Sequence, residues 1–312
     1  MQKSEYIEAA EHIEITEDAE AAVNNRIKKR IANPKRISTS KRVGTSKLAV
    51  VILLFVCLIQ LIPFYLGLVA SFKGARDLST AWAVPFGSVT IENYQIAIER
   101  GGIWQAVLNT AIVTVIATVL VVILGALASY PLARRQTRFN KLILLGTLAV
   151  MMIPSLAILV PLIRLLKSFG LMNTYFGLIF PLVAGALPQA IFLYTQSLRG
   201  IPKSLEEAAM IDGAGTLRTF ISIVLPLLKP VTITVVILTG TTVWNEFALS
   251  GYIMTQNDLR TLAPAIAAFF GAAGANVNAA IAASFLGVIP VLAAYLFLQK
   301  YFIKGMLAGA VK

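Results

Sequence analysis

The chain is short of the residue types from which most metal and nucleophilic sites are built. Its 312 residues include one cysteine, Cys57, and one histidine, His12. This composition argues against a Cys/His zinc site and against a Cys–His nucleophilic pair. A single cysteine also leaves no intrachain disulfide, so neither metal nor disulfide chemistry is expected.

Charged residues are scarce as well. They make up 13% of the chain, whereas a soluble globular protein has about 25%. Apolar residues make up 57%, and they gather into runs of roughly twenty or more, the length needed to cross a bilayer. The chain is therefore predicted to be an integral membrane protein with the lipid bilayer as its surroundings.

A third absence concerns nucleotides and nucleic acids. The sequence has no G-x-x-x-x-G-K-[ST] loop, so the chain is not expected to bind and split ATP by that route. The net charge of +12 does not indicate a nucleic-acid partner, because the basic residues flank the apolar runs. That placement is typical of a chain whose charges set its orientation in a membrane.

The apolar runs predict an all-α polytopic membrane protein with six transmembrane helices. Their expected bounds are 48–72, 104–132, 141–166, 175–198, 227–250 and 279–302. Each is long enough to cross about 30 Å of hydrocarbon with some tilt. The run 262–275 is too short for a span and carries Pro264, Gly271 and Gly274, so we interpret it as an interfacial or re-entrant helix on the outer face.

Charge also predicts the orientation. With both termini in the cytoplasm, 21 of the 27 Lys and Arg residues lie on the cytoplasmic side, which is the positive-inside pattern. Residues 1–47 then form a cytoplasmic tail, acidic in its first half and basic in its second. We interpret this tail as mobile, with a weak anchor on anionic lipid as the alternative.

The polar stretch "SLEEAAMIDGAGTLRTFISIVLPLLKP" (204–230) lies between the fourth and fifth predicted spans. Ser204 and Glu207 have the spacing of a capping box, and Gly213 suits the left-handed turn that ends a helix. A second helical piece is expected from near Thr216. The stretch therefore predicts a short rigid cytoplasmic helix with small side chains and two carboxylates. It is either a docking element for a cytoplasmic partner or an amphipathic loop helix that rests on headgroups.

Within this stretch, Glu207-Ala208-Ala209, then Gly213, then Ile223-Val224-Leu225-Pro226 resemble the EAA signature of ABC-importer permeases. In that family the loop, here 199–226, forms the coupling helix that sits in a cleft of a cytoplasmic ATPase. The resemblance implies this coupling role for Ser204, Glu206, Glu207, Ala208, Ala209, Asp212, Gly213, Ala214, Leu225 and Pro226.

Other stretches resemble the smaller permease of maltose-type carbohydrate importers. They are "SFK" (71–73), "ENY" (92–94), "WNEF" (244–247), "RTLAPAI" (260–266) and "LQKYFIKGMLAGAVK" (298–312). The similarity covers about 48–312, the expected transmembrane domain, and leaves out the N-terminal tail. It departs from the family at Glu246, where aspartate is more common.

The resemblance implies a permease of a bacterial or archaeal cytoplasmic membrane that imports a sugar or oligosaccharide by alternating access. Its implied partners are a second homologous permease in a heterodimer, two ATPase subunits that use ATP and Mg, and an extracellular or periplasmic solute-binding protein. The chain itself is expected to be no enzyme and to bind no cofactor. The C-terminal Gly305, Gly309 and Lys312 are implied to reach between the ATPases, with a frayed chain end as the alternative.

Five polar residues in or beside the spans are candidates for the translocation path or gate: Asn109, Gln189, Gln196, Asn245 and Glu246. Neutral donors and acceptors suit sugar hydroxyls, but structural hydrogen bonds between helices would explain them equally well. Glu246 carries a charge and should therefore face protein or water instead of lipid.

Three other functions are alternatives for this sequence. A permease of the same superfamily for a non-sugar solute, such as a glycerol-phosphate derivative, would differ only in the chemistry of its cavity. An ion-coupled secondary transporter would need intramembrane carboxylates and usually internal repeats, whereas the spans hold one carboxylate, Glu246, and no clear repeat. A membrane-embedded enzyme would need a His/Cys or paired-carboxylate arrangement that the spans lack.

Overall fold

The computed structural model describes residues 47–74, 82, 84–85, 89–135, 137–271 and 276–310. Side chains beyond residue 297 and that of residue 155 lie outside the description. The predicted tail 1–47 therefore lies outside the described residues except for Lys47. Contacts divide the chain into two units, Met1–Ile62 and Pro63–Lys312.

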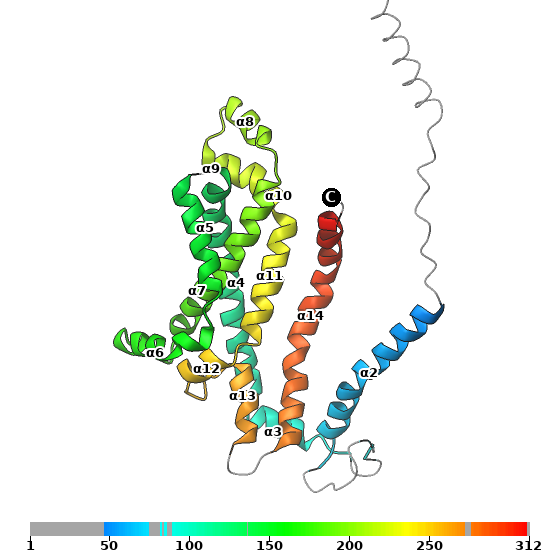
Figure 1. Cartoon of the computed structure of the whole chain (residues 1–312). Coiled ribbons are helices and arrows are strands. Elements are labelled where there is room, and N and C mark those ends of the chain that lie inside the picture. Colours follow the sequence, from blue (N-terminus) through cyan, green and yellow to red (C-terminus); the bar gives the residue numbers. More distant parts are fainter. Residues whose placement is uncertain are drawn as a thin grey trace, which may run out of the picture. The chain divides into compact units, whose positions relative to one another are not determined.

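Helices form nearly all of the regular structure (Figure 1). The α-helices are α2 (Lys47–Ser71), α3 (Glu92–Glu99), α4 (Ile103–Arg134), α5 (Arg138–Met151), α6 (Leu159–Ser168), α7 (Tyr175–Arg199), α8 (Ser204–Ile211), α9 (Thr216–Thr219), α10 (Leu225–Leu227), α11 (Lys229–Trp244), α12 (Ala248–Ile253), α13 (Leu262–Ala267) and α14 (Val277–Ala310). Ser155–Ile158 and Ala268–Phe270 form 3₁₀ turns, and Phe220–Val224 forms a π-helical turn. The all-α prediction is confirmed.

Four helices are long and apolar enough to cross a membrane by themselves: α2, α4, α7 and the Val277–Phe297 part of α14. Two further candidate spans are bent pairs, and counting each pair as one span gives six. The four continuous helices lie within two residues of the predicted bounds, except that α14 continues eight residues beyond 302, and each accommodates at least one proline inside the helix.

The third predicted span, 141–166, is not one helix. It consists of α5 and the segment Leu156–Ser168, which are bent by 87° relative to one another. The break lies at Pro154, which has no backbone N–H and disfavours helical geometry in the residue before it. The predicted span 141–166 is therefore a helix pair broken at Pro154 and not one continuous helix.

The fifth predicted span, 227–250, is also interrupted. The segment Thr216–Leu227 meets α11 at 74°, next to Pro226 and Pro230. At the other end, α11 stops at Trp244, and a separate short helix, α12, begins at Ala248. The predicted outer helix within 262–275 is present as α13 and the 3₁₀ turn that follows it, up to Phe270.

The core of the second unit lies where α4 packs along α7. Small residues bring the two backbones close, since a Cβ added at Gly125 would meet the Ala190 Cβ at 3.0 Å. Tyr194 is fully buried beside this contact, and its hydroxyl lies 3.1 Å from Thr232 Oγ1 on α11. Close approach through small residues is the usual basis of helix packing in membranes, so α4, α7 and α11 form the frame that carries the polar stretch.

Candidate coupling site

The helix α8 stands where the polar stretch predicts it, but its start differs. Lys203 is the N-cap and Ser204 is already helical, with no side chain capping the first turn. The predicted capping box is therefore wrong, because Glu207 falls at the fourth helical position instead of the third. The Lys203 carbonyl accepts the N–H groups of Glu206 and Glu207 instead, at 2.9 and 3.0 Å.

The end of α8 follows the prediction. Gly213 has φ +81°, the left-handed conformation that favours glycine. Its N–H donates to the Met210 carbonyl at 3.0 Å, and the Ala214 N–H donates to the Ala209 carbonyl at 2.9 Å. These two bonds make a complete Schellman motif, so α8 ends in a defined turn.

The carboxylate of Glu206 ties α8 to the end of α4. Arg134 Nε donates to Glu206 Oε1 at 2.7 Å, and the Tyr130 hydroxyl donates to Oε2 at 2.9 Å. Arg134 Nη2 approaches Oε1 at 2.5 Å as an ion pair, outside the alignment of a hydrogen bond. Glu206 is 5% exposed, and a buried carboxylate is tolerated only when paired in this way.

The same arginine also reaches the end of α7. Arg134 Nη1 donates to the carbonyls of Leu198 and Ile201, at 2.9 and 3.1 Å. The last carbonyls of a helix lack intrahelical partners, and Arg134 supplies one for Leu198. Phe220 adds a ring contact on Tyr130 with centroids 5.1 Å apart. One side chain therefore joins α4, α7 and α8 at this end of the helices.

The outer face of α8 is free of such contacts. Glu207, Ala208 and Asp212 are exposed, and Ile211 is 86% exposed. Leu205 and Met210 are exposed as well, whereas Ala209 is buried. In Figure 1, α8 projects beyond the ends of α5 and α7. An apolar side chain left in water on a tightly held helix is typical of a surface that a partner covers.

The rest of the EAA stretch returns the chain to the helix bundle. Ala214 and Leu225 are half-buried, Pro226 is exposed, and Val224 and Leu228 are fully buried. The π-helical turn shifts the register of the helix between α9 and α10, and such turns often mark functional positions.

Asn109 is fully buried, and its side-chain amide forms hydrogen bonds with other groups of the protein. Its Nδ2 donates to the carbonyls of Asp258 and Arg260, and its Oδ1 accepts from Gln105 Nε2 and the Tyr175 hydroxyl. With no exposed surface, Asn109 has no atom free to contact a solute in this structure. Its role here is to hold the segment before α13 against α4.

The other path candidates divide into two kinds. Glu246 accepts the N–H groups of Leu249 and Ser250, both at 2.7 Å, and so caps the start of α12. Asn245 is exposed, although its Nδ2 donates to the Thr241 carbonyl. Gln189 and Gln196 are exposed seven residues apart on α7, a spacing that puts both on one helix face.

A groove of about 580 Å³ lies between α4, α11 and α14. Its lining is almost entirely apolar, with Gly240, Thr241 and Trp244 on α11. Two hydroxyls of α4 line it, those of Thr114 and Thr118, and both are buried without a hydrogen-bond partner in the described part of the chain. The accessible surface of the groove is therefore apolar, and the two unpaired hydroxyls of its lining are themselves buried.

Among the described residues no three His, Cys, Asp or Glu side chains gather in a way that could hold a metal ion. Cys57 on α2 is a free, exposed thiol.

Comparison with known proteins identifies the kind of molecule to which these features belong. Residues 122–308, more than half of the chain, match the family described as binding-protein-dependent transport system inner membrane component. The chain belongs to this family. The matched residues include all of α7 to α13, and with them the EAA stretch and its attachment to the bundle.

Individual relatives agree with the family assignment of this permease. It is 40% identical to the melibiose/raffinose/stachyose import permease protein MelC of Bacillus subtilis (strain 168), over 80% of the chain and 91% of MelC. It is 32% identical to the trehalose/maltose transport system permease protein MalG of Thermococcus litoralis, over 82% of the chain and 92% of MalG. It is 33% identical to the trehalose transport system permease protein SugB of Mycobacterium tuberculosis, over 78% of the chain and 89% of SugB.

The fold of the permease also has a solved counterpart. The structure of a bacterial ABC transporter involved in the import of the acidic polysaccharide alginate matches 82% of this chain and 95% of its own, with a TM-score of 0.70 and 21% identity. The predicted family and the predicted multi-pass architecture are both confirmed. The permease is an inner-membrane transport component and not itself an enzyme.

Sequence reasoning missed the residues that hold α8. Arg134 entered the prediction only as one of the cytoplasmic charges, and Tyr130 did not enter at all. The sequence pattern predicts the Glu206 carboxylate on the surface of α8, whereas the side chain is buried against α4. The one available signal was a pair of adjacent glutamates on a helix of eight residues, which cannot both face the same way.

The C-terminal segment that is predicted to reach between the ATPases lies partly outside the described residues. Gly305 and Gly309 lie within α14, which continues to Ala310, and Lys312 lies outside the described residues.

Proposed function

We propose that this permease imports a sugar or oligosaccharide, taking energy from partner ATPases that dock on α8. The coupling role rests on the different environments of two neighbouring glutamates. Glu206 is buried and fixes α8 to α4, while Glu207 beside it is exposed together with Ile211. The helix is thus firmly attached on one side and uncovered on the other.

The energetics favour a firm attachment. Moving a two-state transporter from 1:99 to 99:1 takes about 5.5 kcal/mol of differential stabilisation. A helix that moved independently of the bundle could not transmit that free energy. Charge-assisted hydrogen bonds are about twice as strong as neutral ones, and the bond between Arg134 and Glu206 belongs to this class.

The partners proposed are two ATPase subunits, a second homologous permease and a solute-binding protein. The family description names the dependence on a binding protein, and two relatives are described as ABC transporter permeases. ATP and Mg would be used by the ATPases. The apolar window of α2 is long and apolar enough to cross a membrane, and we propose that lipid or the second permease covers it. We further propose that the segment including Gly305, Gly309 and Lys312 contacts the ATPases.

The proposal of a sugar rests on the named solutes of the relatives: melibiose, raffinose, stachyose, trehalose and maltose. Uptake of these five sugars by cells that carry the complete transporter is the direct test. We expect at least one of them to enter in an ATP-dependent manner. If none of the five sugars entered and a phosphorylated solute showed saturable transport instead, the proposal that the solute is a sugar would be rejected.

Docking is tested by variants of the exposed face of α8. We expect Glu207→Lys and Ile211→Asp each to abolish uptake and the co-purification of the ATPases, because both place an unfavourable charge on the contact surface. Membrane insertion should be unchanged. Thr216→Asp, an exposed change at the start of α9, is the matched control and should retain uptake. Normal transport by both α8 variants would show that this helix is not the coupling element.

For the path, we propose that exposed Gln189, Gln196 and Asn245 contact the solute, with Glu246 shaping the gate through its cap on α12. Gln189→Ala is expected to raise the KM for uptake several-fold with the thermal stability unchanged. Asn109→Ala should instead lower stability, because two carbonyls and the part-buried Tyr175 hydroxyl lose their partner. Equal KM values for Gln189→Ala and the unmodified permease would remove Gln189 from the path.

A further inference from the structure

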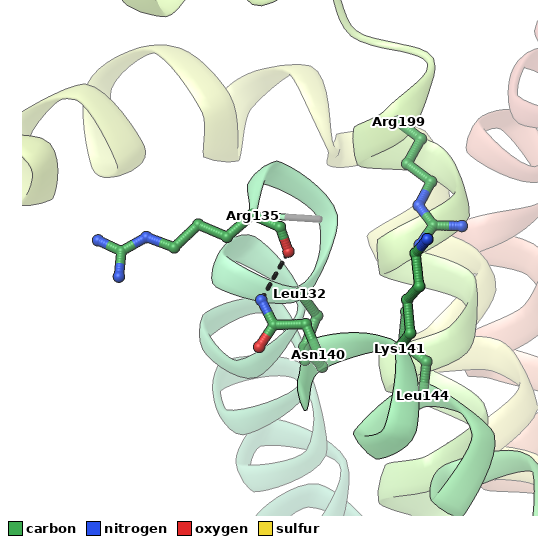
Figure 2. Close-up of a pocket in the computed structure, with 6 residues that line it drawn as sticks. All are labelled: Leu132, Arg135, Asn140, Lys141, Leu144 and Arg199. Atoms are coloured by element: carbon green, nitrogen blue, oxygen red, sulfur yellow. Dashed lines mark hydrogen bonds between the residues drawn. The ribbon is translucent and has the colours of Figure 1, made fainter. Parts of the chain in front are cut away.

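A small cavity lies where α4, α5 and α7 meet, next to the attachment of α8. Its volume is about 190 Å³. It is lined by Leu132 of α4, by Arg135 at the C-cap of α4, by Asn140, Lys141 and Leu144 of α5, and by Arg199 of α7. Figure 2 shows Lys141 and Arg199 extending toward one another, while the Arg135 guanidinium points away from both. Three cationic side chains thus line one cavity.

These cations have no acidic partner in the part of the chain that the structure describes. The ion pair found there joins Arg134 to Glu206, and no hydrogen bond involves the side chains of Arg135, Lys141 or Arg199. Asn140 does not neutralise them either. Its Nδ2 donates to the carbonyls of Arg135, at 2.7 Å, and Pro131, at 3.1 Å, and so braces the cavity wall. All three side chains are exposed, and like charges that line one cavity repel one another, so an anion between them would be favourable.

The start of α5 adds further positive charge at this cavity. The N-terminus of a helix carries partial positive charge and favours acidic residues. The first turn of α5 has none and carries Arg138, with Lys141 following it. These cations therefore add to the positive field of the helix end. Such an arrangement costs stability unless an anion binds there, since a helix N-terminus is itself an anion site.

The exposed surface of α5 indicates the source of the anion. No residue of α5 is buried, and Leu145 and Leu148 are exposed apolar side chains. They lie four and seven residues after Lys141, so they continue its helix face away from the cavity. A ligand with a phosphate at the cavity would therefore find an apolar surface directly below it, which matches a lipid and not free phosphate.

We propose that this cavity binds the phosphate of an anionic lipid headgroup in the cytoplasmic leaflet, between Lys141 and Arg199, with an acyl chain along Leu145 and Leu148. Leu132 and Arg134 both belong to the last turn of α4, so the bound headgroup lies at the same end of this helix as the Arg134–Glu206 pair that holds α8. The site does not depend on which solute is transported.

The test is native mass spectrometry of the complete transporter in detergent, titrated with phosphatidylglycerol or phosphatidylcholine. We expect phosphatidylglycerol to bind and phosphatidylcholine to bind far more weakly. The double variant Lys141→Gln/Arg199→Gln should bind phosphatidylglycerol about 30-fold more weakly, since each basic residue contributes about a fivefold factor toward an anionic lipid surface. Arg164→Gln is the matched control, because it removes an exposed cation of α6 that does not line the cavity and does not belong to the start of α5. It should leave binding within twofold.

Charge-preserving exchange, Lys141→Arg with Arg199→Lys, should retain binding and guards against a simple folding defect. Equal binding of phosphatidylglycerol by the double glutamine variant and the unmodified transporter would overturn the proposal. So would competition by millimolar inorganic phosphate without any lipid binding, which would assign the cavity to a free anion. Loss of the ATPase subunits from the double variant, with lipid binding unchanged, would overturn it as well by assigning the cations to an acidic protein surface.

Discussion

At the scale of single residues, the decisive feature is that adjacent glutamates on α8 have opposite environments. Glu206 accepts hydrogen bonds from Arg134 and Tyr130, whereas Glu207 is exposed and makes no ion pair within the described residues. Removing one partner of a buried pair leaves the other charge uncompensated, at a cost of about 3–5 kcal/mol. An exposed glutamate makes no such contribution to stability.

We therefore expect Glu206→Ala to destabilise the chain by about 3 kcal/mol or more, and Glu207→Ala to change stability by less than about 0.5 kcal/mol. Thermal unfolding of the two variants in the same detergent measures the difference. Glu206→Gln, which keeps an acceptor for Tyr130, should fall between them. Equal melting temperatures for the two alanine variants would mean that the pair with Arg134 contributes nothing.

At the scale of elements, the turn after α8 determines where the helix ends. Gly213 has φ +81°, which costs a residue with a Cβ roughly 1–2 kcal/mol. Gly215, two residues later, has φ −70° and open space around an added Cβ, and it is the N-cap of α9. The two glycines are close in sequence and differ in what their backbone requires.

The same substitution at both positions separates these roles. Gly213→Ser should lower stability by about 1 kcal/mol and reduce uptake. Gly215→Ser should be neutral or slightly stabilising, because serine is a good N-cap. Thermal unfolding together with uptake measures both. A stable and fully active Gly213→Ser variant would show that the left-handed turn is dispensable.

The elements also show what the sequence can and cannot predict. The bounds of α4 and α7 follow from apolar runs, and the left-handed conformation at Gly213 from a local glycine signal, because length, hydropathy and turn chemistry are local properties. The break at Pro154 was missed because a proline can either kink or end a helix, and the packing around it decides which. The pairing of Arg134 with Glu206 joins residues 72 apart, so no local pattern could have indicated it.

At the scale of the whole molecule, the positive-inside pattern makes a prediction about the two ends of the helix bundle. It assigns α8 to the cytoplasm and the segment between α12 and α13 to the outside. In Figure 1, α8 and α12 lie at opposite ends of α7 and α11. The distribution of charge and the arrangement of these helices therefore assign the two segments to opposite sides of the membrane.

The single cysteine makes this orientation directly testable. Cys57→Ser removes the only thiol, and single cysteines can then be placed at Asn257, which is exposed between α12 and α13, or at Asp212, which is exposed at the end of α8. A membrane-impermeant maleimide added to intact cells should label Asn257→Cys and leave Asp212→Cys unlabelled until the membrane is opened. Because α7 and α11 connect the two ends, reversal of one label without the other would contradict the fold, and reversal of both would contradict only the orientation. In the second case α8 would face away from any cytoplasmic ATPase, and the coupling role proposed for Glu207 and Ile211 would be lost with it.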